Sequence, residues 1–240
     1  ATSGLAEMDY WLTDDYLNPP DTAEQFTEEL YRLPVFYQYP SGTEMPDVKP
    51  PPVLQTGHIT FASFNSPAKV NEQVLALWAE VLKAVPDSKL LLKYKNWYAQ
   101  PSLQNTTIER LAASGIDSER VSFEAASDTF AEHLGRYAAV DIALAPFPFN
   151  GATTTFQALS MGVPVITLAG DTFISRMAAS LLHQIGLDDL AADTPEAYVD
   201  CAKNLATDSE RLKTLRAELR QRLGDSPLCD APAYANSFEV

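Results

Sequence analysis

The chain has 240 residues, and 46% of them are hydrophobic, which is enough to bury the core of one large domain or of one domain with part of another. Its 32 acidic residues outnumber 17 basic ones, and the net charge of −15 argues against a nucleic acid or an anionic membrane as partner. We recognise no signal peptide and no apolar run that spans a bilayer, so we expect a cytoplasmic protein. Cys201 and Cys229 are too far apart to indicate a disulfide framework or a zinc site.

The two ends of the sequence indicate a fragment. The first residue is Ala1 rather than methionine, and the pattern before Val240 is that of a helix that has not ended. We therefore expect further chain on either side.

The first 33 residues carry weak patterns. Residues 1–18 are polar and aromatic and predict a short strand at most. Residues 22–33 predict a helix, because Phe26, Leu30 and Leu33 fall on one helical face and acidic residues on the other.

A proline-rich stretch then separates two parts of the chain. Residues 35–39 are suited to a strand, and the prolines between Pro40 and Pro52 predict an extended, stiff connector. We expect a domain boundary here, with residues 1–56 preceding a lobe formed by residues 57–240.

From residue 57 onward, strand and helix patterns alternate. The predicted strands are 58–64, 89–94, 120–123, 141–145 and 163–168. The predicted helices are 71–84, 102–113, one from a cap at Ser127 or Asp128 to about 138, one from near Thr153 to a stop at Gly162, 174–185, 195–207 and 209–223. This rhythm predicts an α/β fold with a doubly wound, Rossmann-like parallel sheet and right-handed crossovers.

Residues 141–170 are the most informative stretch for function. A helix that starts within Gly151–Thr155 presents unpaired backbone N–H groups and hydroxyls at the carboxyl edge of the sheet. The positive end of the helix dipole makes such a place suited to a phosphate. The local pattern leaves an alternative open, in which Thr153 is only the N-cap of an ordinary turn.

Two further residues are predicted at the same edge. Lys69 follows the first strand of the lobe, where it is either a solvated surface residue or a cation for a phosphate. His133 lies on the helix after the third strand, where it is either structural or a ligand contact. His58 and His183 lack metal-ligand spacing, and the glycine fingerprint for dinucleotides is absent, so we expect neither a metal nor a nicotinamide cofactor.

Several motifs together resemble those of a known family. They are Gly4-Leu5-x-x-Met8-Asp9-Tyr10, Phe64-Asn65-x-x-x-Lys69, the helix through Leu77-Trp78-Ala79-Glu80-Val81-Leu82, Asn150-Gly151-x-Thr153-Thr154 and Gly170-Asp171-Thr172-x-x-Ser175-Arg176. In this order, over residues 2–232, the chain resembles the C-terminal catalytic lobe of the O-linked N-acetylglucosamine transferases, and most of all their bacterial and plant SPINDLY-like relatives.

The resemblance implies an inverting, metal-independent glycosyltransferase of the two-lobed GT-B type. Its donor substrate is a nucleotide sugar, typically UDP-N-acetylglucosamine, or GDP-fucose in some plant relatives, and it needs no cofactor. Its acceptor is a Ser or Thr hydroxyl on a protein. The family's usual catalytic-base candidate, a histidine of the N-terminal lobe, has no counterpart here, and neither do the upstream helical repeats that present the acceptor. We expect this chain alone to bind nucleotide weakly and to transfer nothing.

Roles for individual residues also come from the resemblance. Lys69 would hold the donor phosphates and, as the catalytic residue, stabilise the leaving diphosphate. Thr153 and Thr154 would bind the diphosphate, and His133 would lie against the nucleotide.

Three residues are of second rank. Asn65 and Gly151 either contact the donor or only shape the loops, and Gln157 stands where the family usually grips the ribose hydroxyls with a carboxylate. Together with Ala152, which replaces a frequent histidine, Gln157 leaves open a different class of protein. That alternative is a non-catalytic, Rossmann-like module whose degraded donor pocket serves protein interaction.

Overall fold

The computed structural model describes residues 2–39 and 45–238, so Ala1, Pro40 and Val240 lie outside the described residues. Its centre is a six-stranded sheet in the order β5-β4-β3-β6-β7-β8, and every neighbouring pair is parallel. The strands are β3 (Thr60–Ser63), β4 (Lys89–Lys93), β5 (Val121–Glu124), β6 (Ile142–Leu144), β7 (Val165–Leu168) and β8 (Ala191–Ala192). This sheet confirms the predicted doubly wound α/β fold.

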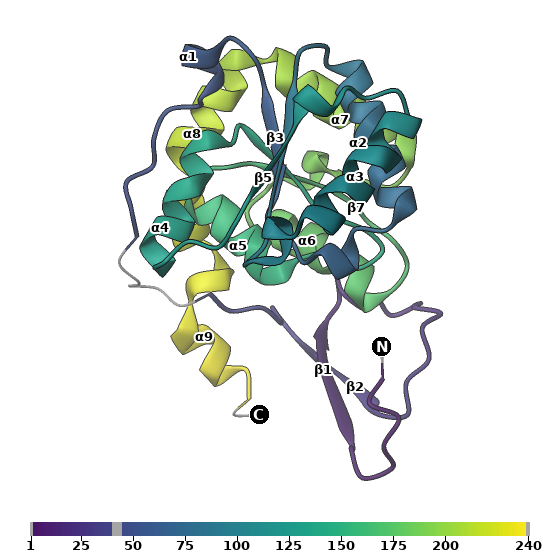
Figure 1. The fold of residues 1–240 in the computed structure, drawn as a ribbon. Coiled ribbons are helices and arrows are strands. Elements are labelled where there is room, and N and C mark those ends of the chain that lie inside the picture. The colour runs from purple at the N-terminus through teal and green to yellow at the C-terminus, as the bar shows by residue number, and fades with distance from the viewer. Residues whose placement is uncertain (1, 40–44, 239–240) are drawn as a thin grey trace.

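Helices cover both faces of the sheet (Figure 1). They are α1 (Val53–Thr56), α2 (Glu72–Ala84), α3 (Pro101–Ala113), α4 (Phe130–Gly135), α5 (Ala152–Ser160), α6 (Phe173–Gln184), α7 (Pro195–Thr207), α8 (Ser209–Gly224) and α9 (Ala231–Asn236). Helices α2, α3 and α7 lie on one side, and α4, α5 and α8 lie on the other (Figure 1). All elements predicted after residue 57 are present with small shifts at their ends, whereas α1, β8 and α9 are too short to show a periodic pattern.

The strand order places a topological switch point between β3 and β6. From β3 the chain moves outward through β4 to β5, then returns to β6 on the other side of β3 and continues to β7 and β8. Phe61 pairs with Ile142 and Ala62 with Ala143 across this junction. Because the loops after β3 and β6 run in opposite directions, the carboxyl ends of these strands border a crevice.

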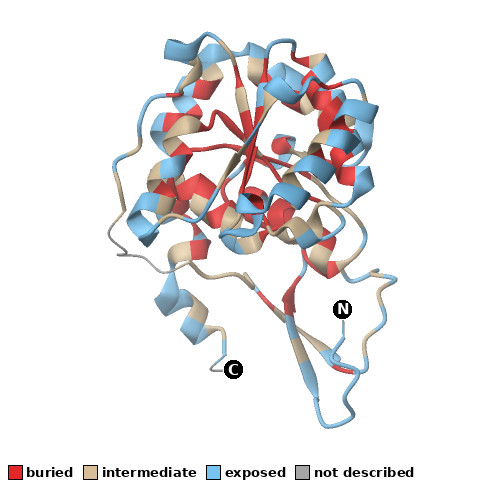
Figure 2. Ribbon diagram, viewed as in Figure 1, coloured by how far each residue is buried: buried red, intermediate tan, exposed pale blue. Residues whose placement is uncertain are grey.

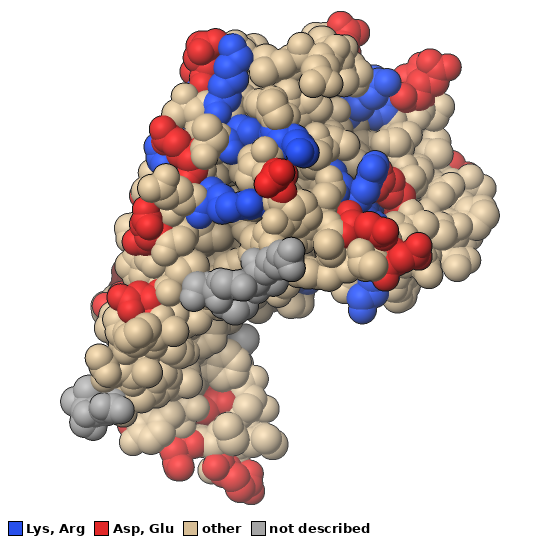
Figure 3. Space-filling view, turned by 90° about the vertical axis from the view of Figure 1, so that its left-hand side faces the viewer, with Lys and Arg blue, Asp and Glu red and all other residues tan. Residues whose placement is uncertain are grey.

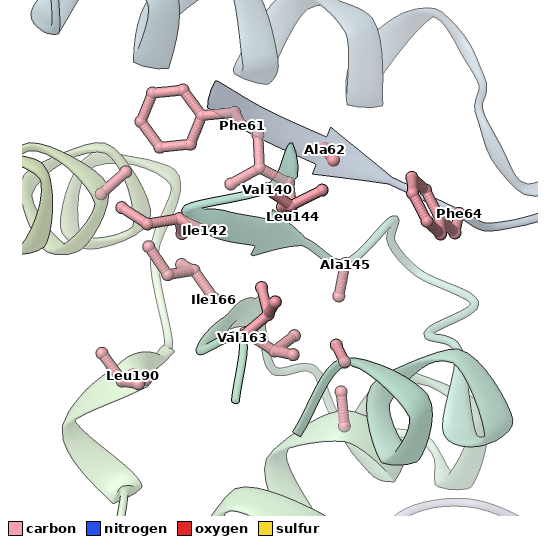
Figure 4. Close-up of a cluster of buried hydrophobic side chains, with 14 of the residues drawn as sticks. Phe61, Ala62, Phe64, Val140, Ile142, Leu144, Ala145, Val163, Ile166 and Leu190 are labelled. Atoms are coloured by element: carbon pink, nitrogen blue, oxygen red, sulfur yellow. The ribbon is translucent and has the colours of Figure 1, made fainter. Parts of the chain in front are cut away.

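The core lies on both sides of the sheet. Apolar side chains of β3, β6 and β7 face inward and are fully buried, among them Phe61, Ile142 and Ile166 (Figure 4). Helices α2 and α7 are joined at Trp78, whose indole Nε1 donates to the Tyr198 hydroxyl at 3.2 Å. Figure 2 shows that burial concentrates in the strands and in the inner faces of the helices.

A buried carboxylate fixes the end of the sheet opposite the crevice. Asp141, which is 1% exposed, precedes β6 and accepts hydrogen bonds from the backbone N–H of Val53 at 3.0 Å and of Thr60 at 2.9 Å. Burial raises the pKa of this carboxyl group, and the two backbone bonds oppose that shift. The carboxylate thus ties α1 and the start of β3 to the start of β6.

The helix predicted for residues 22–33 is wrong. This stretch instead leads into β2 (Glu29–Leu33), which pairs in parallel with β1 (Tyr10–Asp14) in a separate two-stranded ribbon below the lobe (Figure 1). Phe26 packs against Trp11 with ring centroids 5.8 Å apart. Pairing with a distant strand therefore overrides the helical spacing, as tertiary context often does.

The segment between the ribbon and the lobe follows the prediction only in part. Residues 35–39 form no strand, and their aromatic rings pack on the lobe, where Tyr39 stacks on Phe156 with centroids 4.7 Å apart. Residues 45–52 have no regular structure and end in α1. The domain division at residue 57 stays a prediction.

The surface mixes charges of both signs. Figure 3 shows the side that lies at the left of Figure 1, where basic and acidic side chains stand next to one another. Along α8, Lys213 pairs with Glu210 and Arg222 with Glu218, each at 2.7 Å. Within residues 2–39 and 45–238, no helix is both long and apolar enough to cross a membrane.

We expect Asp141→Ala to lower the free energy of unfolding by about 2–5 kcal/mol, because two buried backbone N–H groups lose their acceptor. Urea denaturation measures the change. Asp193→Ala serves as the control, since Asp193 is exposed and its removal is expected to change stability by no more than about 0.5 kcal/mol. Equal effects of the two substitutions would contradict the role given to Asp141.

Candidate functional site

All the site residues predicted from the sequence line one cleft at the carboxyl edge of the sheet. The cleft has a volume of about 690 Å³. The predicted residues that line it are Asn65, Lys69, His133, Gly151, Thr153, Thr154 and Gln157. They come from four segments of the chain, the β3–α2 loop, α4, the β6–α5 turn and α5, which meet at the switch point.

The start of α5 is an open helix N-terminus. Gly151 is the N-cap residue, and it has no side chain to cap the first backbone N–H groups. The alternative in which Thr153 is the N-cap is wrong, because the helix begins at Ala152 and places Thr153 in its first turn. The Thr153 side chain is exposed to the cleft. Uncapped N–H groups at the positive end of a helix can bind an anion.

The Thr154 hydroxyl is already engaged. Its Oγ1 donates to Asn65 Oδ1 at 2.7 Å, and the Asn65 amide in turn donates to Ser63 Oγ at 3.2 Å. A hydroxyl has one proton to donate. Of the two donors of Thr154, the backbone N–H is therefore the one that remains available to an anion. Asn65 is buried and joins the end of β3 to the first turn of α5, which makes it a residue that shapes the site.

Gly151 is required by close packing rather than by an unusual backbone angle. Its φ is −98°, which any residue adopts. A Cβ atom at this position would lie 2.0 Å from Thr154 Oγ1 and 2.1 Å from Asn65 Oδ1. Any side chain would therefore break the hydrogen bond between those two atoms.

Lys69 reaches across the crevice from the β3–α2 loop. Its Nζ donates to the backbone carbonyl of Asn150 at 2.8 Å and lies 3.6 Å from the centre of the Phe149 ring. The side chain is half-buried, and loss of solvent lowers the pKa of its ammonium group. Lys69 is therefore partly withdrawn from solvent, and its charge stands immediately before the start of α5. Its role as a cation for a phosphate stays a prediction.

His133 and Gln157 contact each other across the cleft. His133 Nε2 lies 3.2 Å from Gln157 Oε1, within hydrogen-bonding distance. Burial lowers the pKa of the imidazole, and the bond to Gln157 opposes the shift. The helix that carries His133 is capped by Thr129, with Glu132 completing a capping box, so the predicted caps at Ser127 and Asp128 are wrong.

The structure adds lining residues that sequence patterns did not single out. Phe149 lies beside Lys69, Phe130 lies beside His133 with ring centroids 6.2 Å apart, and Lys93 and Lys95 line the far end of the cleft. Lys93 ends an apolar run that reads as a buried strand. A charged residue at the carboxyl end of a buried strand is the sequence signal that could have indicated Lys93 as a cleft residue.

The charge of the cleft is opposite to that of the chain. Lys69, Lys93 and Lys95 line it, whereas Asp128 is its only acidic lining residue in the part of the chain that the structure describes. Within the same residues no group of three or more His, Cys, Asp or Glu side chains is placed to hold a metal ion. A cationic cleft beside an uncapped helix start suits a phosphorylated ligand.

The fold is that of the Rossmann-like lobes of GT-B glycosyltransferases. It resembles the C-terminal domain of a glycosyl transferase group 1 family protein from Francisella tularensis, with a TM-score of 0.55, 15% sequence identity, and coverage of 77% of this chain and 96% of that one. At that identity the likeness shows the fold alone. The sequence is more specific: residues 52–238 match the model of glycosyl transferase family 41, and the chain belongs to this family.

Individual relatives agree with this assignment. The chain is 39% identical over 241 residues to the probable UDP-N-acetylglucosamine–peptide N-acetylglucosaminyltransferase SPINDLY of Arabidopsis thaliana, covering 99% of this chain and 26% of that protein. A solved structure of a Thermobaculum terrenum O-GlcNAc transferase mutant superposes with a TM-score of 0.88 and 33% identity, covering 99% of this chain and 44% of that one. The chain thus spans about a quarter of the length of the SPINDLY relatives it matches.

We expect Gly151→Ala to lower the free energy of unfolding by about 1–3 kcal/mol, because the added methyl group displaces Asn65 or Thr154. Chemical denaturation measures this. The matched control is Gly135→Ala, where the added Cβ meets nothing within 4 Å and φ is −58°. That change is expected to be neutral or to stabilise by up to about 1 kcal/mol. A neutral Gly151→Ala would refute the close-packing requirement.

Proposed function

We propose that this chain is the donor-binding part of an inverting, metal-independent O-linked glycosyltransferase. The observation that carries the proposal is the meeting of Lys69 with the start of α5. The ammonium group bonds the carbonyl of Asn150, one residue before the uncapped N-terminus of the helix. A cation and a row of free N–H groups thus converge where a ligand's phosphates would lie.

The chemistry of glycosyl transfer explains why these groups are needed. When the sugar leaves its nucleotide, negative charge develops on the departing diphosphate. In the proposed reaction Lys69 is the catalytic residue that stabilises this charge, and the N–H groups of Thr153 and Thr154 bind the phosphate oxygens. These groups are held in place before the ligand arrives, so little reorganisation is needed as the charge develops.

The donor and acceptor are proposed from the relatives. Those proteins are named for UDP-N-acetylglucosamine and for peptide, so we propose a UDP sugar, foremost UDP-N-acetylglucosamine, as the donor and Ser or Thr of a protein as the acceptor. No cofactor is involved. The second lobe, with the catalytic base, and helical repeats for the acceptor are proposed partners from the longer protein. The cytoplasm is the proposed compartment, in keeping with the free thiols of Cys201 and Cys229.

We expect UDP to bind this chain in the micromolar to millimolar range in the presence of EDTA. Lys69→Ala is expected to weaken binding by about ten- to hundredfold, because a charge-assisted contact with the diphosphate is lost. Isothermal titration calorimetry measures both values. The control is Lys203→Ala, which removes an exposed lysine of α7 away from the cleft and is expected to leave the affinity unchanged.

Two outcomes would argue against the proposal. Equal UDP affinities of the wild type and Lys69→Ala would remove the proposed diphosphate site. Failure of both UDP and GDP to bind would favour the non-catalytic interaction module instead.

A further inference from the structure

Lys93 is a buried lysine that forms no ion pair with any residue that the structure describes. The residue is 1% exposed, lies at the carboxyl end of β4 and lines the cleft. Its ammonium group donates a hydrogen bond to the backbone carbonyl of Ala125 and forms no ion pair within residues 2–39 and 45–238. Lysine is almost never fully buried unless it is paired, so this ammonium calls for an explanation.

The Glu124 carboxylate, on the strand that pairs with that of Lys93, forms its ion pair with Arg136 instead. Both oxygens of Glu124 accept from the Arg136 guanidinium, one of them at 2.8 Å from Nε and the other from Nη2. Such a two-point ion pair is the geometry that Arg and carboxylate groups prefer. Lys93 is left with a long-range attraction to Glu124 and a repulsion from Arg136, while burial lowers the pKa of its ammonium group.

The sheet order places Lys93 at the nucleoside end of the proposed site. Lys69 and α5 mark the diphosphate position at the β3–β6 junction, and β4 is the next strand on the β3 side. Adjacent strands are spaced by about 5 Å. The cleft extends in this direction, because its lining includes residues 93–95 and 126–130, whereas Met177 is its only lining residue after β7 among those described. A base attached through ribose to the diphosphate would lie above β4 and β5.

The chemistry of an ammonium group restricts what it can bind there. It has three donors and no acceptor, and the Ala125 carbonyl uses one of the donors. A group that meets a remaining donor must therefore offer a lone pair. Uracil and guanine present exocyclic carbonyl oxygens. Adenine has none, because it carries an amino group at the six-position, where guanine has its carbonyl, and its acceptors are ring nitrogens set closer to the ring.

We propose that Lys93 donates a hydrogen bond to an exocyclic carbonyl of the donor's base, and that it selects nucleotides with a carbonyl-bearing base over adenine nucleotides. The inference rests on the proposed function, because the diphosphate position fixes where the base lies. It names Lys93 as a specificity residue and leaves the choice between uracil and guanine to other contacts.

The test compares ADP with inosine diphosphate, which differs from ADP by a carbonyl in place of the six-amino group and the accompanying ring proton. We expect the wild-type chain to bind inosine diphosphate and UDP about ten- to hundredfold more tightly than ADP, by calorimetry. Lys93→Met, of similar length and without charge, is expected to abolish the preference and to leave the affinity for inorganic pyrophosphate unchanged. The matched control is Lys89→Met, at the exposed opposite end of the same strand, which is expected to keep the preference.

Several results would overturn the inference. Equal binding of ADP and inosine diphosphate by the wild type would overturn the inference. This result needs no variant, so it holds even if Lys93→Met fails to fold. An equal loss of pyrophosphate and inosine diphosphate affinity in Lys93→Met would show that Lys93 only holds the loop at Ala125. If pyrophosphate binding does not depend on Lys69, the proposed function itself fails, and that result is separate from the base comparison.

Discussion

The parallel pairing of β3 with β6 is the constraint on which the rest of this molecule depends. It brings together two strands about 80 residues apart in sequence, through Phe61 with Ile142 and Ala62 with Ala143. Because the chain leaves these strands in opposite directions, Lys69 and Gly151 arrive at the same crevice from opposite sides. Asp141 holds the other end of the same pair by accepting from the N–H of Thr60. The register of β3 against β6 thus determines where the site residues stand relative to one another.

At the crevice, close packing around Gly151 fixes the positions of the site residues. Gly151 has no side chain, so Asn65 and Thr154 can meet above it. Their hydrogen bond fixes the first turn of α5 against the end of β3 and consumes the Thr154 proton. What Thr154 still offers a ligand is its backbone N–H, whose direction the helix sets. Backbone donors do not change rotamer, so they suit a site that must be ready before an anion binds.

The sequence predicted the sheet and the crevice better than it predicted the contacts within them. Buried apolar runs and helical stripes are local signals, and they correctly placed the elements after residue 57. The helix predicted for residues 22–33 is wrong because the spacing of Phe26, Leu30 and Leu33 suits a helix, whereas the pairing with β1 is a long-range interaction that a local pattern does not contain. Lys93 was missed for a similar reason, since its lack of an ion pair among the described residues depends on the pairing of Glu124 with Arg136.

In the proposed function, the site so formed would provide one half of a transfer reaction. In an inverting transfer the acceptor hydroxyl attacks the sugar from the side opposite the departing phosphate, so the group that removes its proton stands away from the phosphate-binding groups. In the proposed site, Lys69 and the start of α5 stand on the phosphate side. His133 lies within hydrogen-bonding distance of Gln157 in the cleft. In the proposed site it would stand toward the nucleoside rather than toward the acceptor. A base from outside this chain is therefore a chemical requirement of the proposed reaction, as well as an implication of family resemblance.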